Sequence, residues 1–375
     1  MKIGMICYPT YGGSGVVATE LGRWLAHRGH SVHYISYAMP FRLATTGQGD
    51  VRYHKVDLLD YPVFPTPSYT LSLAVKVASL TDEVGLDLVH VHYAVPHAVS
   101  AYLARQMLAP RRLAVVTTLH GTDITLVGSN ALLRTAVRFA IEQSDRVTAV
   151  SRWLREQTIE QLGVRRPIEV VPNFVDPDIY RPRHHDCPMR RFVGESEKVI
   201  LHISNFRPVK RTGDVVRAFA LIRRKIPARL LLVGEGPDRQ NAEDIARQEN
   251  ILDSVVFLGQ HSSPECFYSI ADLFLLTSKD EAFGLAALEA MSAEVPVVAY
   301  AGGGLNELVR DGETGYLVPF GDVGALARRA LELLGDPERA EAMGKRARQI
   351  VLENYVPQQV VPLYERIYQD ALDAV

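Results

Sequence analysis

The chain has 375 residues, and its formal net charge at pH 7 is only −2 because 41 Lys and Arg nearly balance 43 Asp and Glu. This length suffices for two domains, each with its own core, and the small net charge excludes a bulk electrostatic drive toward nucleic acid or an anionic membrane. No stretch approaches the ~18 apolar residues of a membrane-spanning helix, and the short apolar N-terminus is typical of a first strand, not of a signal peptide. We therefore expect a soluble, cytoplasmic protein.

The cysteines add little chemistry of their own. Cys7, Cys187 and Cys266 are odd in number and lack the spacing of a metal site. They indicate a reducing compartment without structural disulfides. We interpret them as three small buried hydrophobes.

Short apolar runs alternate with amphipathic stretches in the first half, which is typical of βα units around a parallel sheet. The predicted strands are residues 2–7, 32–36, 88–92, 113–119, 146–150 and 168–171. Helices fit between them, for example over residues 16–27 and 131–143. This pattern predicts a doubly wound α/β domain over residues 1–171.

The second half repeats the pattern, with predicted strands at residues 199–203, 230–233, 255–258, 273–277, 297–300 and 315–318. Between the halves, residues 172–197 are rich in Pro, Arg and His, and four prolines interrupt any regular element, so this segment is interpreted as a linker. A second domain then covers residues 198–355, and the break at residues 355–357 begins a final helix. Two such domains facing one another would bind their ligand between the carboxyl ends of the two sheets.

The first strand leads into a glycine loop, Tyr-Gly-Gly-Ser-Gly at residues 11–15. Glycines let the backbone approach a ligand closely, and the helix that starts next favours an anion. The spacing is not G-x-G-x-x-G, and no acidic residue follows the second strand to bind a nicotinamide ribose. Dinucleotide redox chemistry is therefore disfavoured.

Polar side chains follow two further strands of this half. Residues 117–123, Thr-Thr-Leu-His-Gly-Thr-Asp, end the fourth strand, which favours His120 as a ligand contact over a core residue. Upstream, His90 and His92 share one face of their strand and Tyr93 projects from the other. Two histidines at this spacing can bind a metal, but no Cys, Asp or third His accompanies them at ligand spacing, so a metal site is disfavoured.

In the second half, residues 204–211, Ser-Asn-Phe-Arg-Pro-Val-Lys-Arg, lead from a strand into a helix. Arg207 can grip phosphate oxygens with a bidentate fork and Lys210 can add a point charge, which together would offset two or more negative charges. The alternative is a set of cations solvated at a domain edge. A later glycine turn, residues 301–307, could line a pyrophosphate with its backbone.

Residues 279–293 place two glutamates eight positions apart around a Phe-Gly helix start. Free backbone N–H groups at such a start can bind a phosphate. Glu281 precedes that start, and Glu289 lies about 12 Å farther along at ~1.5 Å per residue, a gap that suits a diphosphate between two polyols. The alternative is a loop acid and a solvated helix glutamate, but the helix around Glu289 is mostly apolar, and a buried carboxylate needs a partner.

With these motifs in place, the chain resembles the family 4 retaining glycosyltransferases of the GT-B fold over essentially its whole length. The resemblance implies two Rossmann-like, doubly wound parallel-sheet domains facing a deep cleft. It assigns acceptor binding to residues 1–171, completed by the helix 356–375, and nucleotide-sugar binding to residues 198–355. Residues 7–22, 40–43, 90–97, 120–125 and 204–211 are similar, more specifically, to the subgroup that couples N-acetylglucosamine to L-malate in bacillithiol biosynthesis.

The resemblance also implies roles for single residues. Arg207 and Lys210 would hold the diphosphate of UDP, Glu281 the hydroxyls of the donor sugar and Glu289 the ribose, with His120 beside the sugar. The remaining implied donor contacts are Gly13, Ser14, Asn205, Phe283, Gly284 and Leu285. The implied catalytic set is His120, Arg207, Lys210 and Glu281. The implied acceptor contacts are Ser14, Tyr93, Thr117 and Arg138.

The implied reaction moves N-acetylglucosamine from UDP-GlcNAc to the hydroxyl of L-malate with retention. No cofactor or metal is expected, because cations and helix N–H groups can stabilise the leaving diphosphate and the Asp-Pro-Asp triplet at 176–178 suits a linker turn. Alternatives are another acceptor (an inositol phosphate, a lipid-linked glycan or a phosphoinositide), a UDP-sugar epimerase, a phosphorylase, and a non-catalytic nucleotide-sugar binding module. We expect no nucleic-acid partner and no membrane insertion. A symmetric homodimer is the commonest assembly of soluble proteins in general, and nothing in this sequence bears on it.

Overall fold

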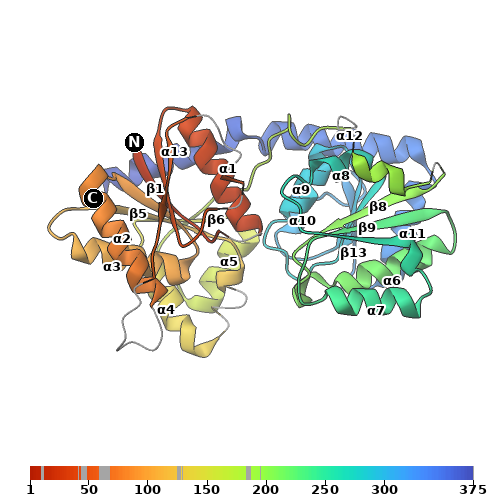
Figure 1. Ribbon diagram of the computed structural model, residues 1–375, viewed down its shortest axis with the longest axis horizontal. Helices are drawn as coiled ribbons and strands as arrows, with labels where there is room; N and C mark the ends of the chain where they lie inside the picture. Colours follow the sequence, from red (N-terminus) through yellow and green to blue (C-terminus); the bar gives the residue numbers. More distant parts are fainter. Residues whose placement is uncertain are drawn as a thin grey trace. The chain divides into compact units, whose positions relative to one another are not determined.

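A computed structural model describes residues 1–375 except 10–11, 41, 44–48, 59–67, 125–127, 129, 183–186, 195 and 375. Four residues of the motifs above, Thr10, Tyr11, Phe41 and Thr125, lie outside the described residues. The chain forms two compact units, Met1–Asn173 with Pro357–Val375, and Phe174–Val356 (Figure 1). Of the segment predicted as a linker, residues 172–173 belong to the first unit and 174–197 to the second. Within the described residues, no helix is long and apolar enough to cross a bilayer.

The first unit contains a seven-stranded sheet in the order β3-β2-β1-β4-β5-β6-β7, and every pairing is parallel. The strands are β1 (Lys2–Ile6), β2 (Ser31–Ser36), β3 (Val51–Lys55), β4 (Leu88–His92), β5 (Ala114–Leu119), β6 (Arg146–Ala149) and β7 (Ile168–Val170). Six were predicted to within one or two residues. The strand β3 was missed because it lies at the sheet edge, where its partly exposed residues form no apolar run.

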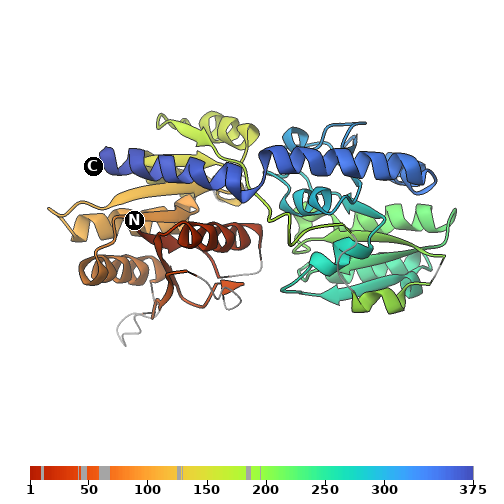
Figure 2. The same cartoon turned by 90° about the horizontal axis from the view of Figure 1, so that it is seen from above.

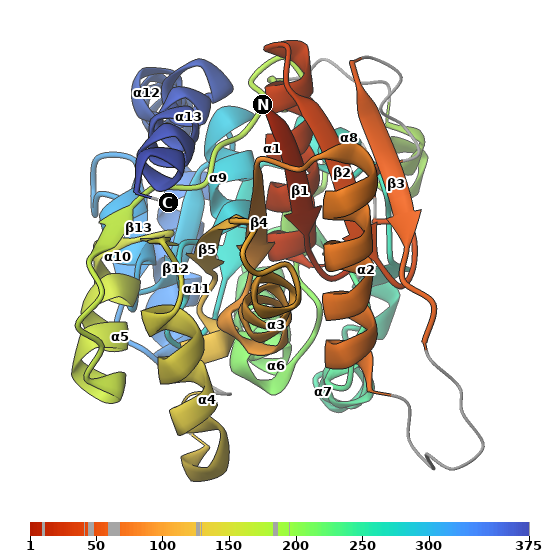
Figure 3. The same ribbon diagram turned by 90° about the vertical axis from the view of Figure 1, so that its left-hand side faces the viewer.

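Helices complete the first unit. They are α1 (Gly13–His27), α2 (Tyr69–Val84), η2 (Ala94–Ala98), α3 (Val99–Met107), α4 (Ala131–Glu142), α5 (Arg152–Leu162) and α13 (Pro357–Asp373). Figure 3 shows β1, β2 and β3 side by side, with α2 next to β2. The last helix, α13, packs on β5, β6 and α1 and buries Tyr364 and Tyr368 there (Figure 2).

The second unit contains a six-stranded parallel sheet in the order β10-β9-β8-β11-β12-β13. Its strands are β8 (Lys198–Ile203), β9 (Ala228–Val233), β10 (Val255–Gly259), β11 (Leu273–Leu276), β12 (Val297–Tyr300) and β13 (Gly315–Val318), all of them predicted. The helices are η4 (Pro188–Phe192), η5 (Pro208–Lys210), α6 (Thr212–Arg223), α7 (Arg239–Gln248), η6 (Leu252–Ser254), α8 (Glu265–Ile270), α9 (Leu285–Ser292), α10 (Leu305–Leu308), α11 (Val323–Leu334) and α12 (Pro337–Asn354).

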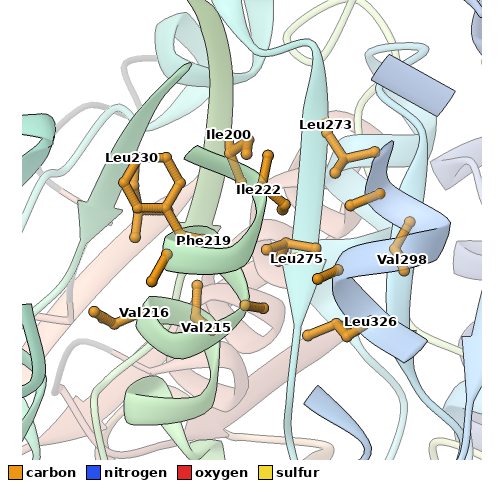
Figure 4. Packing of buried hydrophobic residues seen from close by; sticks show 14 of the residues in the cluster. Ile200, Val215, Val216, Phe219, Ile222, Leu230, Leu273, Leu275, Val298 and Leu326 are labelled. Atoms are coloured by element: carbon orange, nitrogen blue, oxygen red, sulfur yellow. The ribbon is translucent and has the colours of Figure 1, made fainter. Parts of the chain in front are cut away.

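The core of the second unit lies between this sheet and its helices. Phe219 and Ile222 repeat at helical spacing on α6 and pack on Ile200 and Leu230 of the sheet, with Leu326 of α11 in the same cluster (Figure 4). Each large side chain buried in this way contributes about 1.5–3 kcal/mol of hydrophobic stabilisation. The loops at the strand ends are therefore anchored to a well-packed core.

Each sheet reverses its strand order once, between β1 and β4 in the first unit and between β8 and β11 in the second. In doubly wound sheets, ligands bind outside the carboxyl ends of the strands at such a reversal. In the first unit these strand ends carry the glycine loop and Tyr93. In the second they carry the loops 204–211 and 277–284, so the sheet topology selects the same loops as the motifs.

Candidate active site

An ion pair joins the two loops at the reversal of the second sheet. Lys210 Nζ lies 2.7 Å from Glu281 Oε2, and the two side chains are only 22% and 16% exposed. Burial raises the pKa of Glu281, but the charge and hydrogen bond of Lys210, with smaller effects from other neighbours, together lower it by more, so its pKa lies below the usual value. Glu281 is therefore an ionised carboxylate at neutral pH, next to a cation.

Backbone contacts hold this pair in place. The Thr277 hydroxyl lies 2.8 Å from the carbonyl oxygen of Lys210, and the Lys279 N–H donates to Val209 O at 2.8 Å. From the other side, the Gly304 N–H donates to Glu281 O at 2.7 Å. Residue 303 must be glycine, because its φ is +62° and a Cβ there would overlap Glu281 O. The glycine turn 301–307 thus supports the backbone of Glu281.

The helix α9 begins directly after this loop, as the sequence predicted. Gly284 precedes it with a φ of +99°, a conformation that favours glycine. Phe283 is 6% exposed, and its ring packs edge-on against Tyr355 with centroids 5.9 Å apart. The first N–H groups of α9 have no partner within the helix.

A neutral histidine lies beneath the ion pair. His202 is fully buried on β8, and since a carbonyl can only accept, its Nδ1–H donates to Leu275 O at 2.9 Å. Its Nε2 then accepts from Ser204 Oγ, also at 2.9 Å. Burial and the nearby charge of Lys210 lower the pKa of His202 to about 4. Sequence reasoning passed over this residue, although a histidine in the apolar run 199–203 is a detectable signal.

The other polar residues of the loop 204–211 differ in what they contact. Arg207 is exposed. Arg211 donates from Nε to Asp214 Oδ2 at 2.6 Å and lies over the ring of Phe320, so it is engaged within the fold. Asn205 Oδ1 is buried, and among the described residues no group donates to it. A buried acceptor of this kind calls for a donor from a ligand or from water.

Glu289 is buried on α9, with 6% of its surface exposed. The hydroxyl of Tyr268, on α8, lies 2.8 Å from Glu289 Oε2 and 3.2 Å from Ala286 O. The prediction that this carboxylate needs a partner is confirmed, and the alternative of a solvated glutamate is wrong. Tyr268 itself was not predicted, because it precedes Glu289 by 21 residues and belongs to no motif.

In the first unit, Ser14 and Tyr93 come together at the reversal of the sheet. The Tyr93 hydroxyl donates to Ser14 Oγ at 2.8 Å, which joins the start of α1 to the end of β4. Tyr93 has a φ of +86°, and its ring lies 5.4 Å from that of His120 and 5.6 Å from that of Tyr8. Ser14, Tyr93 and His120 therefore form one polar group beside the glycine loop.

His120 is hydrogen-bonded to a second histidine. Its Nε2 lies 2.8 Å from His92 Nδ1, and the rings are stacked. Burial lowers the pKa of His120 to about 3 and that of His92 well below the usual value, so both rings are neutral at pH 7. His90 shares the face of His92, as predicted, and bonds to Tyr368 and Thr118.

The contact of His92 with Met5 decides which nitrogens carry protons. His92 Nε2 lies 3.2 Å from Met5 Sδ, and a thioether can only accept. The proton of neutral His92 therefore sits on Nε2, and Nδ1 accepts from His120 Nε2–H. His120 Nδ1 is then an acceptor, which suits a hydroxyl and repels a carboxylate or phosphate oxygen.

Two of the four predicted acceptor residues lie elsewhere. Thr117 is fully buried, and its hydroxyl is hydrogen-bonded to Ser144 Oγ at 2.7 Å. Arg138 is exposed on α4, and its guanidinium lies near Gly163 at the end of α5. Among the described residues, no group of three or more His, Cys, Asp or Glu side chains could hold a metal ion.

Comparisons with known proteins assign this arrangement to a family. The model for glycosyltransferase family 4 matches residues 11–179, and the model for group 1 glycosyl transferases matches residues 190–350. The N-acetyl-alpha-D-glucosaminyl L-malate synthase of Bacillus anthracis is 46% identical over 373 residues, which cover 99% of this chain and 97% of that protein. The chain is a family 4 glycosyltransferase.

Two further similar proteins bear on the fold of this chain. A GDP-mannose-dependent alpha-(1-6)-phosphatidylinositol monomannoside mannosyltransferase of Mycolicibacterium smegmatis is 32% identical over 298 residues, 76% of each chain. The structure of Anabaena Alr3699/HepE in complex with UDP and glucose has a TM-score of 0.82 at 21% identity, with 98% and 99% of the two chains covered. This likeness confirms the GT-B fold class of the family 4 glycosyltransferase, with two Rossmann-like domains. The two sequence relatives differ in the substrates that their names give, L-malate for the first and GDP-mannose with a phosphatidylinositol monomannoside for the second.

Proposed function

We propose that this glycosyltransferase transfers N-acetylglucosamine from UDP-GlcNAc to the hydroxyl of L-malate with retention of the α configuration, the first step of bacillithiol biosynthesis. The observation that carries the proposal is the 46% identity to a protein named N-acetyl-alpha-D-glucosaminyl L-malate synthase, because it extends over 99% of the chain and so includes the loops of both units. The mannosyltransferase relative matches only 76% of the chain, at 32% identity.

The donor is assigned to the second unit. Lys210 and the exposed Arg207 would bind the diphosphate, assisted by the N–H groups of Phe283, Gly284 and Leu285 at the start of α9. Glu281, held as a carboxylate by Lys210, would accept hydrogen bonds from the sugar hydroxyls. These groups supply positive charge and N–H donors where negative charge grows on the leaving phosphate. We therefore propose that the enzyme requires no metal cofactor.

The nucleoside end of the donor is assigned to Glu289 and Asn205. Tyr268 orients the Glu289 carboxylate at 2.8 Å, and a carboxylate has further lone pairs with which to accept from the ribose hydroxyls. Asn205 Oδ1, a buried acceptor, would take an N–H or O–H of the nucleotide. Both residues thus present hydrogen-bond acceptors to the hydroxyl and N–H donors of the nucleoside.

The acceptor is assigned to the first unit. Ser14 and Tyr93 would bind malate, Gly13 and Ser14 would also contact the donor, and His120 Nδ1 would accept from a hydroxyl of the donor sugar. Malate also carries two carboxylates, for which Thr117 and Arg138 remain the residues implied by the family resemblance. Ser14 and Tyr93 carry more of the proposal, because their hydroxyls already meet at 2.8 Å.

In the proposed reaction, the malate oxygen forms a bond to the anomeric carbon on the face from which the phosphate departs. The bond between that carbon and the phosphate oxygen breaks, and UDP leaves with the electron pair. The proton of the malate hydroxyl passes to the departing phosphate oxygen. No enzyme carboxylate need attack the sugar in this scheme.

A UDP-release assay tests the proposal. The full-length enzyme is given UDP-GlcNAc alone, with L-malate, and with an inositol phosphate, and GDP-mannose replaces the donor in a parallel series. We expect UDP only when UDP-GlcNAc and malate are both present, and an α-linked product by proton NMR. Release that ignores malate, or that requires the inositol phosphate or GDP-mannose, would contradict the proposal.

A further inference from the structure

Two cysteines of the second unit lie in contact. The sulfurs of Cys187 and Cys266 are 2.8 Å apart, although 79 residues separate them in sequence, and both are free thiols. Cys7 and Cys187 are buried free thiols, as expected, whereas Cys266 is only partly buried. A disulfide bond is about 2.05 Å long, so the sulfurs need to approach by less than about 1 Å to form one.

The two thiols differ in access. Cys187 precedes η4 and is buried, with 5% of its surface exposed, whereas Cys266 lies in the first turn of α8 and is only partly buried. A small reagent can therefore reach Cys266 first, and Cys187 is then placed to attack the modified sulfur from within the protein. Neither cysteine belongs to the group of residues assigned to the substrates.

We propose that Cys187 and Cys266 form a reversible disulfide, an oxidative modification site on the helix that orients Glu289. The oxidant is a small-molecule disulfide, RS–SR. Cys266 Sγ loses its proton and attacks one sulfur of RS–SR, which breaks that bond and releases RS⁻. Cys187 Sγ then loses its proton, bonds to Cys266 Sγ and expels the second RS⁻. Two electrons pass from the two cysteines to RS–SR, and the two protons yield two RSH.

The bond would act on Glu289 through α8. Tyr268 lies two residues beyond Cys266 on this six-residue helix, and the Ser269 hydroxyl donates back to Cys266 O at 2.7 Å. The Tyr268 hydroxyl in turn holds Glu289 Oε2 at 2.8 Å. A covalent link between Cys266 and Cys187 would therefore shift the helix that carries Tyr268 and so change this hydrogen bond. This consequence rests on the proposed role of Glu289 as the ribose ligand.

The environment of Cys266 makes the exchange slow at neutral pH. Burial, and then the neighbouring Cys187 thiol, raise the pKa of Cys266 to about 12. Since the thiolate is the nucleophile, the rate of disulfide formation should rise as the pH rises toward that value. Cys7 provides an internal control, because it is 1% exposed and belongs to the first unit, whereas Cys187 and Cys266 belong to the second.

Peptide mapping of the full-length protein tests the disulfide. The protein is incubated at about pH 8.5 with 2-hydroxyethyl disulfide, alkylated without reduction, and digested, with a sample treated with dithiothreitol beside it. We expect a cross-linked peptide pair that contains Cys187 and Cys266, a mass lower by two hydrogens, and full reversal by dithiothreitol. Free thiols at both positions after exhaustive treatment, or a stable mixed disulfide on Cys266, would overturn the proposal.

Kinetics test the coupling to the donor. With the disulfide fully formed, we expect the KM for UDP-GlcNAc to rise about fivefold with little change in kcat, as for a weakened ground-state contact. Cys187→Ser should abolish this response to the oxidant, and Cys7→Ala should retain it. An unchanged KM after complete cross-linking would overturn the coupling. If the reduced protein does not turn over UDP-GlcNAc and malate at all, the proposed function fails, while the peptide map still decides the disulfide.

Discussion

The two units hold their candidate ligand groups in opposite electrostatic states. Lys210 and Glu281 are separated by 2.7 Å as a pair of full charges, whereas His92 and His120 are separated by 2.8 Å as a pair of neutral rings. Burial favours the neutral form of every one of these groups. In the second unit the two opposite charges offset that effect, and in the first unit the neighbours of each ring include other histidines, so the neutral forms prevail.

This difference indicates what each unit can bind. A charged pair at a helix start suits a diphosphate, whose charge is permanent and grows as the bond breaks. A neutral ring selects its ligand by direction alone, since the nitrogen that lacks a proton accepts and the other donates. The difference between the two units can therefore be tested by removing a charge from the second unit or by moving a proton from one ring nitrogen to the other in the first.

The largest effect is expected from Lys210→Ala. This variant removes a cation from the diphosphate site and leaves Glu281 buried without its counter-charge, so the pKa of Glu281 should rise. We expect kcat/KM to fall by on the order of 10²- to 10³-fold, the usual cost of one electrostatic donor to a transition state. Steady-state UDP release measures it.

Lys279→Ala is the matched control. Lys279 is exposed and lies in the loop that contains Glu281, and its N–H bond to Val209 O survives truncation of the side chain. We expect less than about a twofold change. An equal loss in both lysine variants would contradict the assignment of the diphosphate to Lys210.

Acid should destabilise the first unit before it disturbs the ion pair of the second. Burial lowers the pKa of His90 and His120 to about 3 and that of His97 to about 4, with His92 also lowered, against about 6.5 when unfolded. The unfolded chain therefore binds more protons between these values, and stability falls as the pH drops below about 6.5. Asp123, whose pKa burial raises to about 6, opposes this because it gains a proton in the folded state.

The expected loss by about pH 5.5 is on the order of 1 kcal/mol for each of these four histidines, roughly 3 kcal/mol from the four after the opposing carboxyl, and His33 and His54, whose pKa values burial also lowers, add to it. The contribution of Glu281, whose folded pKa is lowered, is lost only below its unfolded value of about 4.5. Urea unfolding followed by tryptophan fluorescence measures the first unit alone, since Trp24 and Trp153 both lie in it. A urea midpoint that is the same at pH 7 and about pH 5.5 would show that the four histidine rings are not held neutral in the folded protein.

A smaller effect is expected from His92→Phe. The phenyl ring fills the space but cannot accept from His120 Nε2–H, which is left with an unsatisfied donor that costs about 1–2 kcal/mol. We expect kcat/KM to fall about tenfold as His120 loses its fixed tautomer. His33→Phe is the control, because it breaks another histidine pair near the edge of the same sheet, in which buried His33 lies 2.9 Å from the partly buried His54. A similar loss in both variants would indicate a general packing defect.

Most of the fold followed from local sequence. Strands buried on both faces are continuous apolar runs, so twelve of the thirteen strands of the described chain were predicted, and only the half-exposed β3 was missed. The loops that carry Lys210, Glu281 and His120 were also predicted, because polar and glycine residues directly after such runs lie at the carboxyl edge of the sheet.

The partners of these residues were not predictable in the same way. Met5 meets His92 across 87 residues, Cys187 meets Cys266 across 79, and Tyr268 meets Glu289 across 21. No periodicity links such positions, and each contact depends on how neighbouring strands or helices are packed. His92 illustrates the limit, since its spacing from His90 indicated a shared face but not that a sulfur atom sets its tautomer.

The smallest expected effect isolates that sulfur. Met5→Leu keeps the apolar volume of a fully buried residue on β1 but removes the acceptor opposite His92 Nε2. Nitrogen-15 NMR of the enzyme should show His92 protonated on Nε2 in the parent and a mixture of Nε2–H and Nδ1–H forms in the variant. We expect kcat/KM to fall less than about threefold, because the bond between His92 and His120 survives in either form and only its direction becomes degenerate. A parent spectrum with the proton on Nδ1 would reverse the donor and acceptor roles of His120, and the first unit would then present a donor to its ligand.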